Sequence, residues 1–142
     1  TQQKKLAQWL IENGADHIIG AHPHVIQPIH VFKDTIHNTS HSIVYSLGNF
    51  ISNMSKRDTD GGLLVKIKLF KSEHKINSLI SYSLVWTGRP IITKEKNFKL
   101  YPISYELDSL NINSRNKLIL FKQGANKVLE HNSTGIEKFI FK

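Results

Sequence analysis

The chain carries the stretch DHIIGAHPHV at residues 16–25, and this stretch decides how its first half is interpreted. Its apolar centre predicts a short buried strand over residues 16–20, with His22 and His24 in the loop that leaves the strand's carboxyl end. Ligands of open α/β sheets bind at such strand ends, and imidazole is the commonest metal-binding side chain. Pro23 has a fixed φ and restricts the residue before it, so we expect the two rings to keep a defined spacing. A surface or hydrogen-bonded histidine pair is the alternative that this stretch alone leaves open.

The flanking sequence predicts a chain of mixed helices and strands. An amphipathic helix over residues 2–13 is followed by Gly14, the natural left-handed stop. Residues 16–20 are apolar on both faces, so we expect this strand at the centre of a sheet. Further strands are predicted at 28–32, 43–47, 63–70, 76–86 and 101–107. The strands at 63–70 and 76–86 are expected to form an antiparallel hairpin. A helix is predicted at 115–130, with Ser114 as its N-cap and an interruption at Gly124. Polar connections are expected at 33–42, 52–61 and 88–99, and the pattern alone indicates an α/β fold.

The composition is that of one globular domain. The 142 residues are 39% hydrophobic and 21% charged, with no apolar run long enough to span a membrane. The polar, basic first residues lead us to expect no signal peptide there. No cysteine is present, which excludes disulfides, thiolate metal sites and cysteine nucleophiles. The formal net charge of +8 favours anionic partners. The lysines are scattered and do not alternate with aromatic residues, so no nucleic acid is expected as a partner.

Several motifs in a fixed order resemble the CapA-like family, the poly-γ-glutamate capsule synthesis proteins of bacteria. They are a helix, GAD at 14–16, GAHPHV at 20–25 and YSLGNF at 45–50. The family is similar to the calcineurin-like metallophosphoesterases, so the resemblance implies part of a two-sheet sandwich with outer helices. Family members carry Gly-Asp, Asn-His and His-Trp-Gly motifs before this helix, and none of them occurs here. We therefore expect residues 1–142 to be the C-terminal part of a larger CapA-like domain.

The resemblance implies that His22 and His24 are metal ligands of a site for divalent Mn, Zn or Fe, and that earlier motifs supply the other ligands. Asn49 follows a buried strand, and its amide could face this site, although asparagine also suits the turn conformation itself. Asp16 could orient a histidine, although it more simply begins the strand. No catalytic residue is assigned, since Ser46 has no base in a recognisable arrangement. His30 stands where the family often has an acidic residue.

The remaining histidines show no spacing typical of metal ligands. They are His17, His30, His37, His41, His74 and His131. His37 and His41 are four residues apart, but they fall in a predicted polar connection rather than a helix. We expect His17 and His30, which fall in predicted strands, to be packed or hydrogen-bonded, and a ligand role for the His37 and His41 pair is the alternative left open.

These observations predict the C-terminal portion of a poly-γ-glutamate capsule biosynthesis protein with a metallophosphatase-like metal site, which would be a hydrolase only in its full-length form. A polyanion-binding module without catalysis, or a general metal-dependent phosphoesterase, are the alternatives. The expected partners are poly-γ-glutamate and either the missing N-terminal half of the domain or a second copy of the chain. Attachment to a membrane, on the outer side of the cell, would depend on a segment outside this sequence.

Overall fold

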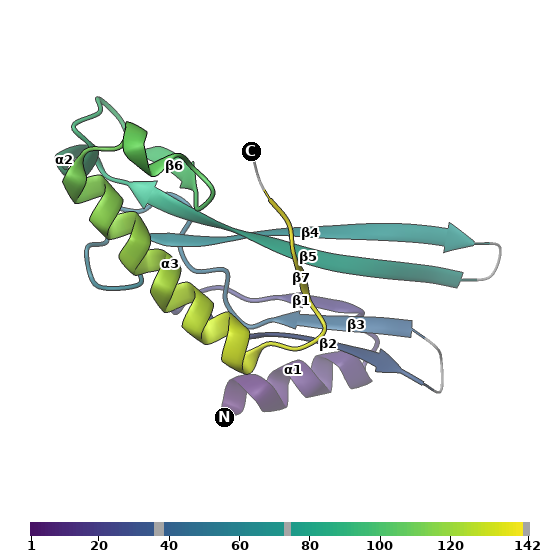
Figure 1. The fold of residues 1–142 in the computed structure, drawn as a ribbon. Helices are drawn as coiled ribbons and strands as arrows, with labels where there is room; N and C mark the ends of the chain where they lie inside the picture. Colours follow the sequence, from purple (N-terminus) through teal and green to yellow (C-terminus); the bar gives the residue numbers. More distant parts are fainter. Residues whose placement is uncertain (36–38, 73–74, 141–142) are drawn as a thin grey trace.

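The computed structural model describes residues 1–35, 39–72 and 75–140, which form an α/β fold of two sheets with helices outside them (Figure 1). The predicted fold class is confirmed at this level. The elements are α1 (Gln2–Glu12), β1 (His17–Ile19), β2 (Ile29–Asp34), β3 (Thr39–Val44), β4 (Gly61–Ser72), β5 (Lys75–Gly88), α2 (Pro90–Thr93), β6 (Lys99–Pro102), the 3-10 helix Leu107–Ser109, α3 (Ile112–Asn132) and β7 (Glu137–Lys138).

The first sheet has the strand order β1-β3-β2. Strand β1 runs parallel to β3, with Ile18 opposite Ile43, and β2 is antiparallel to β3. The prediction that residues 16–20 form a central strand is therefore wrong within this chain, because β3 takes the centre and β1 the edge. Ile19 on β1 is accordingly 46% exposed, whereas Val44 on β3 is fully buried.

The second sheet has the order β4-β5-β6, and β7 pairs with β5 in parallel. The predicted antiparallel hairpin is confirmed, with Leu63 opposite Leu84 and Val65 opposite Tyr82. These four side chains belong to the face of the hairpin that joins the main core. The turn of the hairpin at 73–74 lies outside the described residues, and so does His74.

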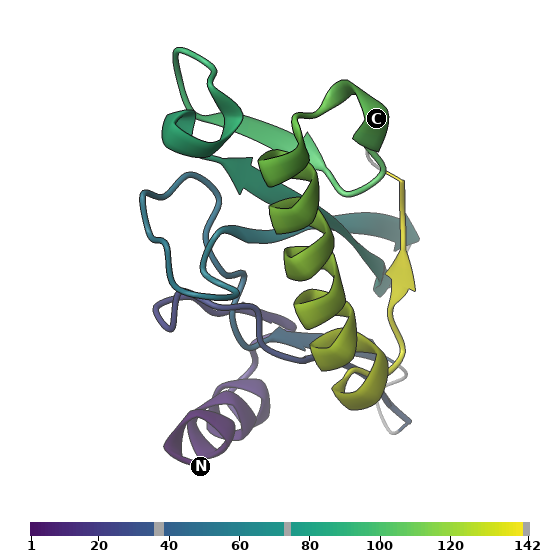
Figure 2. The ribbon, with the colours of Figure 1, turned by 60° about the vertical axis from the view of Figure 1, so that its left-hand side comes forward.

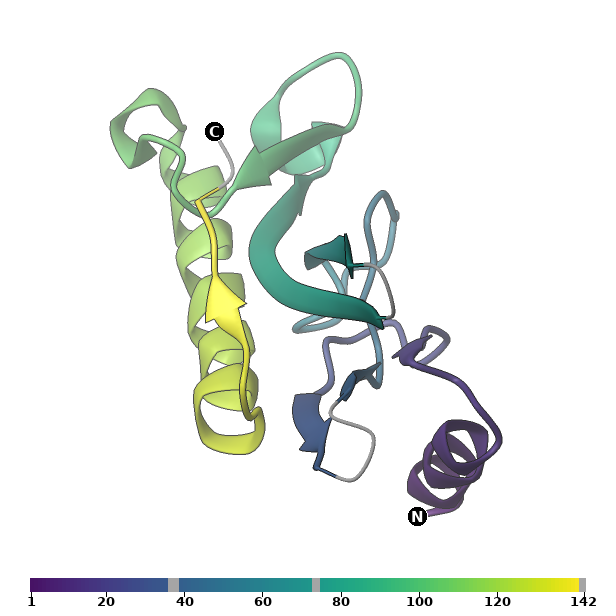
Figure 3. The ribbon, with the colours of Figure 1, turned by 90° about the vertical axis from the view of Figure 1, so that its right-hand side faces the viewer.

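The main core lies between this second sheet, the inner face of the first sheet and α3. Helix α3 buries Leu118, Phe121 and Leu129 against β5, on which Trp86 and Leu84 are fully buried. Helix α1 lies far from α3 (Figures 2 and 3) and covers a small cluster around Ala7, Ile43 and Tyr45. Ile11 packs partly buried against this cluster, whereas Leu6 and Trp9 stay open to solvent, 58% and 57% exposed.

Four element predictions need correction. Strand β3 begins at Thr39, inside the predicted polar connection, because its polar residues pair with β2. A helical turn, α2, occupies Pro90–Thr93 in the expected irregular loop, and proline suits its first position. The strand predicted at 101–107 is β6, which spans Lys99–Pro102 instead.

The fourth correction concerns α3, which begins earlier than predicted and continues through Gly124. Asn111 is the N-cap, and its side chain accepts a hydrogen bond from the Ser114 backbone N–H at 3.0 Å. Gly124 does not interrupt the helix. A Cβ there would lie 2.2 Å from Asp58 Oδ1, so the glycine allows the 52–60 loop to approach the helix closely.

Among residues 1–35, 39–72 and 75–140, none of the helices combines the length and the hydrophobicity that a membrane crossing requires.

Candidate functional site

The histidine loop, residues 20–25, leaves the carboxyl end of β1 as predicted. Gly20 anchors it: its N–H donates to the Val44 carbonyl at 2.7 Å, and its carbonyl accepts from the Leu47 N–H at 3.1 Å. A Cβ on Gly20 would lie 2.3 Å from the Tyr45 carbonyl oxygen, so only glycine fits this approach. The loop is therefore fixed to the chain that leaves the neighbouring strand β3.

Both histidines of the loop have positive φ angles. His22 has φ 98° and His24 has φ 61°, backbone conformations that residues other than glycine seldom adopt. Both side chains are exposed, and their ring centroids lie 6.3 Å apart. Such strain concentrates at functional sites, where it persists because the surrounding structure enforces it.

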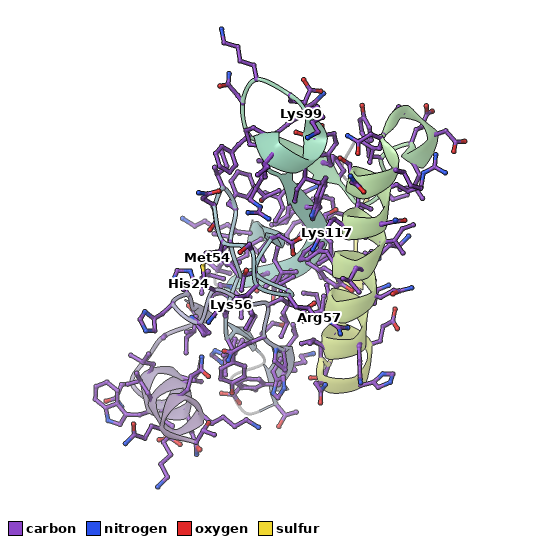
Figure 4. All side chains as sticks on the ribbon, turned by 90° about the vertical axis from the view of Figure 1, so that its left-hand side faces the viewer. His24, Met54, Lys56, Arg57, Lys99 and Lys117 are labelled. Atoms are coloured by element: carbon purple, nitrogen blue, oxygen red, sulfur yellow. The ribbon has the colours of Figure 1, made fainter. Side chains whose placement is uncertain are left out.

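Asn49 lies directly against His24. Its Oδ1 is 2.9 Å from His24 Nδ1, and its Nδ2 donates to the His24 carbonyl at 3.3 Å. The same Nδ2 donates to the Thr59 carbonyl at 2.7 Å and lies 3.5 Å from Met54 Sδ. Figure 4 shows His24 and Met54 beside each other at one edge of the molecule. The structure thus brings together two of the predicted site residues that are 25 positions apart in sequence.

The turn that carries Asn49 is held against β4 by backbone contacts. Gly48 has φ 74° and pairs with Gly62, while the Asn49 N–H donates to the Gly61 carbonyl at 3.0 Å. A Cβ on Gly62 would lie 2.6 Å from the Asn49 carbonyl oxygen. The start of the hairpin therefore sets the position of Asn49.

Asp16 lies at the other end of β1, away from the histidine loop. Its backbone carbonyl accepts from the Ser42 N–H at 3.1 Å, and its carboxylate is 70% exposed and 3.8 Å from His41 Nδ1. Its suggested role in orienting a site histidine stays a prediction, and its contacts are those of a residue that begins a strand.

His17 occupies the same end of the first sheet. Its Nδ1 lies 2.8 Å from Ser42 Oγ, and burial lowers the pKa of its imidazole, an effect that Asp16 opposes and His41 reinforces. His30 contacts the Asn132 carbonyl at 3.1 Å. These two histidines are packed and hydrogen-bonded as expected, whereas His37 falls outside the described residues.

An apolar groove lies beside the histidine loop. It encloses ≈ 400 Å³ and is lined by Ile19 and Ala21 from one side, the turn that carries Asn49 from another, and Leu63 to Val65 of β4. Phe50 at its rim is 51% exposed. The groove beside the loop is therefore lined by apolar side chains.

The donor set matches part of a metal site. Two exposed imidazoles on one strained loop are suitable ligands for Mn, Zn or Fe ions. Within the three described segments, however, no group of three histidine, cysteine, aspartate or glutamate side chains is placed to surround one ion. The chain can thus supply His22 and His24, and other ligands would have to come from elsewhere.

The sequence does not reveal the two residues that contact the Nδ2 end of the Asn49 amide. Thr59 acts through its backbone carbonyl and Met54 through its sulfur, both from the 52–60 loop. A backbone carbonyl has no sequence signature, and a lone methionine in a polar loop carries no signal for this role.

Fold and site together define an α/β protein with a histidine pair at the carboxyl end of an edge strand. Residues 1–54, which include this pair and Asn49, match the family model described as bacterial capsule synthesis protein PGA_cap. The predicted resemblance to the CapA-like family is thereby confirmed for the first part of the chain.

Two curated relatives agree with this match. The chain is 39% identical to the PGA biosynthesis protein CapA of Bacillus subtilis (strain 168) over 71 residues, which is 50% of this chain and 17% of that protein. It is 40% identical to the capsule biosynthesis protein CapA of Bacillus anthracis over 68 residues, 48% of this chain and 15% of that protein. The similarity thus spans about a sixth of each relative's length, and no solved structure matches the chain.

Proposed function

We propose that this chain is the C-terminal part of a poly-γ-glutamate capsule biosynthesis protein, and that His22 and His24 are ligands of a divalent metal ion in it. The contact between His24 and Asn49 carries the proposal, because it gives one exposed imidazole of the pair a fixed partner at the end of two adjacent strands. The CapA proteins of two bacilli share about 40% identity with this part of the chain, which supports the capsule assignment.

A divalent ion bound there would lower the pKa of a coordinated water or polarise a phosphoryl or carbonyl oxygen. The residues of this chain would hold the ion and orient its ligands. His22 and His24 would donate ring nitrogens, Asn49 would fix the ring of His24, and Gly20 keeps the loop against the strand end. The full-length protein would be a metal-dependent hydrolase of the metallophosphoesterase type.

The other ligands would come from a longer polypeptide or from a second chain. Such a segment could cover the apolar groove beside the loop and the outer edge of β1, with which no strand of the described residues pairs. We accordingly expect the 142-residue chain alone to show no phosphatase or γ-glutamyl hydrolase activity, because two histidines on one loop cannot hold a metal pair.

The metal content of the full gene product tests this function. The double variant His22→Ala/His24→Ala should lose most of its bound metal in elemental analysis, because two inner-sphere bonds are removed. His131→Ala, which removes an exposed imidazole on α3, serves as the matched control and should keep the wild-type content. Equal metal content in the double variant and the wild type would reject the assignment.

A second candidate function is the binding of an anionic polymer without catalysis. Three lysines, Lys66, Lys68 and Lys138, line a cavity of ≈ 360 Å³ in which Glu137 is the one acidic residue among the lining residues described. Burial lowers the pKa of Lys138, an effect that the neighbouring Lys122 reinforces and Glu130 opposes. Binding of polyglutamate that weakens steeply with salt and persists in the histidine double variant would favour this function.

A further inference from the structure

The amide of Asn49 can have only one orientation. Its Nδ2 faces the Thr59 carbonyl oxygen at 2.7 Å, so this end must be the donor, since a flipped amide would place two oxygens against each other. The His24 carbonyl oxygen at 3.3 Å is a second acceptor on the same side. The opposite end of the amide, which faces the imidazole, is therefore the acceptor Oδ1.

This orientation determines which nitrogen of His24 carries the proton. Asn49 Oδ1 lies 2.9 Å from His24 Nδ1 and has no hydrogen to donate, so Nδ1 must donate. In a neutral imidazole the other nitrogen, Nε2, then keeps its lone pair free. The side chain of His24 is exposed, and the structure gives no partner for Nε2 among the hydrogen bonds of the described residues.

We propose that Asn49 is a positioning residue that fixes His24 in the Nδ1–H tautomer and presents Nε2 as the ligand atom. The role of Nε2 rests on the metal site proposed above, whereas the tautomer follows from the hydrogen bonds alone. The 52–60 loop takes part through the Thr59 carbonyl, because that contact decides which end of the amide meets the ring.

The same contacts support the strained backbone of the histidine loop. Asn49 binds both the ring and the carbonyl of His24, a residue at φ 61°, so a single side chain links the β3 end to the loop. Ring orientation and backbone conformation are thus set together. Outer partners of metal-binding histidines commonly act in this way, and their loss typically costs about 10- to 100-fold in metal affinity.

Nitrogen NMR of the imidazole tests the proposal in the 142-residue chain without any metal. Spectra are recorded at about pH 8.5, where histidine is neutral, and the His24 signals are identified by their loss in His24→Gln. We expect the Nδ1–H tautomer in the wild type and a mixture of tautomers in Asn49→Ala. Asn49→Asp should keep the Nδ1–H tautomer, since a carboxylate oxygen accepts from Nδ1, while its second oxygen turns away from the Thr59 carbonyl, which repels it.

Asn53→Ala is the matched control, since it removes an exposed amide four residues away, and it should leave the wild-type tautomer unchanged. An Nε2–H tautomer or a mixture in the wild type would overturn the proposal, as would an unchanged Nδ1–H tautomer in Asn49→Ala. If Asn49→Ala does not fold, the His24 tautomer seen in the wild-type and Asn49→Asp spectra still tests the proposal.

Titration with Zn²⁺ then separates the two proposals. Weakening by about 10- to 100-fold in Asn49→Ala, with near wild-type affinity in Asn49→Asp, supports the positioning role at a metal ligand. Equal loss in both variants would mean that Asn49 has only a structural role, and would overturn it. An Nδ1–H tautomer in the wild-type chain, together with an unchanged metal content of the full gene product in His22→Ala/His24→Ala, counts against the metal site while supporting the inference on Asn49.

Discussion

The histidine loop and the core around α3 are built in opposite ways. The loop, residues 20–25, is exposed at both histidines, has positive φ at both, and lies inside the stretch that matches the capsule protein family. Phe121 and Trp86 are buried at the centre of the main core and lie outside that stretch, while Ile29 and Val44 of the stretch join the same core. The candidate site therefore lies within the matched stretch, whereas the core draws on both parts of the sequence, and the two regions meet at the turn that carries Asn49.

The largest expected effect separates the two regions. Phe121→Ala removes a ring that is 2% exposed and should lower the free energy of unfolding by about 3–5 kcal/mol. Leu120→Ala, its exposed neighbour on α3, should cost about 1 kcal/mol or less. Urea unfolding measures both. A change in the His24 imidazole signal of folded Phe121→Ala would show that the regions are more closely coupled than we describe.

Gly62→Ala should affect both regions, because this glycine lies at their junction. Its added Cβ would lie 2.6 Å from the Asn49 carbonyl oxygen and 2.7 Å from that of Leu47. We expect a loss of about 2 kcal/mol in stability together with a shifted His24 signal in NMR. Gly14→Ala, where the Cβ would meet nothing within 4 Å but φ is 97°, serves as a control for strain alone and should leave the signal in place.

His22→Gly tests whether the loop is held under strain. Glycine adopts φ 98° freely, so this variant should be about 1 kcal/mol more stable than His22→Ala, although both lose the imidazole. Thermal unfolding of the pair compares them directly. Equal stability of the two variants would show that the loop is not strained at His22.

The smallest expected effect is a pH dependence at the far end of β1. Burial lowers the pKa of His17 below 6.5, so the unfolded chain binds a proton more readily than the folded chain. The stability that His17 contributes is present above pH 6.5 and is lost as the pH falls through the lowered pKa. His17→Gln should flatten this part of the stability curve relative to His131→Gln, and an unchanged slope would contradict the assignment.

The parts of the fold that sequence predicted well have strong local signals. Apolar alternation identified the β4–β5 hairpin, and the helix at the start ended at Gly14 as expected. Strand β3 was placed too late because Thr39 to Ser42 are polar, and only pairing with β2 makes them a strand. The cap of α3 was misplaced from Asn111 to Ser114, since both residue types cap helices and the choice depends on the side-chain contact.

The candidate site was predictable to a similar extent. The order of the motifs pointed to His22, His24 and Asn49 before any geometry was known, and the structure brings His24 and Asn49 into contact. The sequence could not indicate that Thr59 orients the Asn49 amide, because the contact is made by the backbone carbonyl of Thr59. The strand predicted over residues 16–20 places Asp16 at its start and the two histidines after its end, and β1 separates them in the same way.

Line broadening by Mn²⁺ in the 142-residue chain tests the central claim most directly, because this ion broadens the NMR signals of the nearest nuclei. The proposed site predicts that the imidazole signals of His22 and His24 broaden first, with the Nε2 of His24 the most affected nitrogen. It also predicts that His17 and His41, at the opposite end of β1, stay sharp at the same ion concentration. Broadening that begins at His17 or His41, or that spares both His22 and His24, would contradict the metal site.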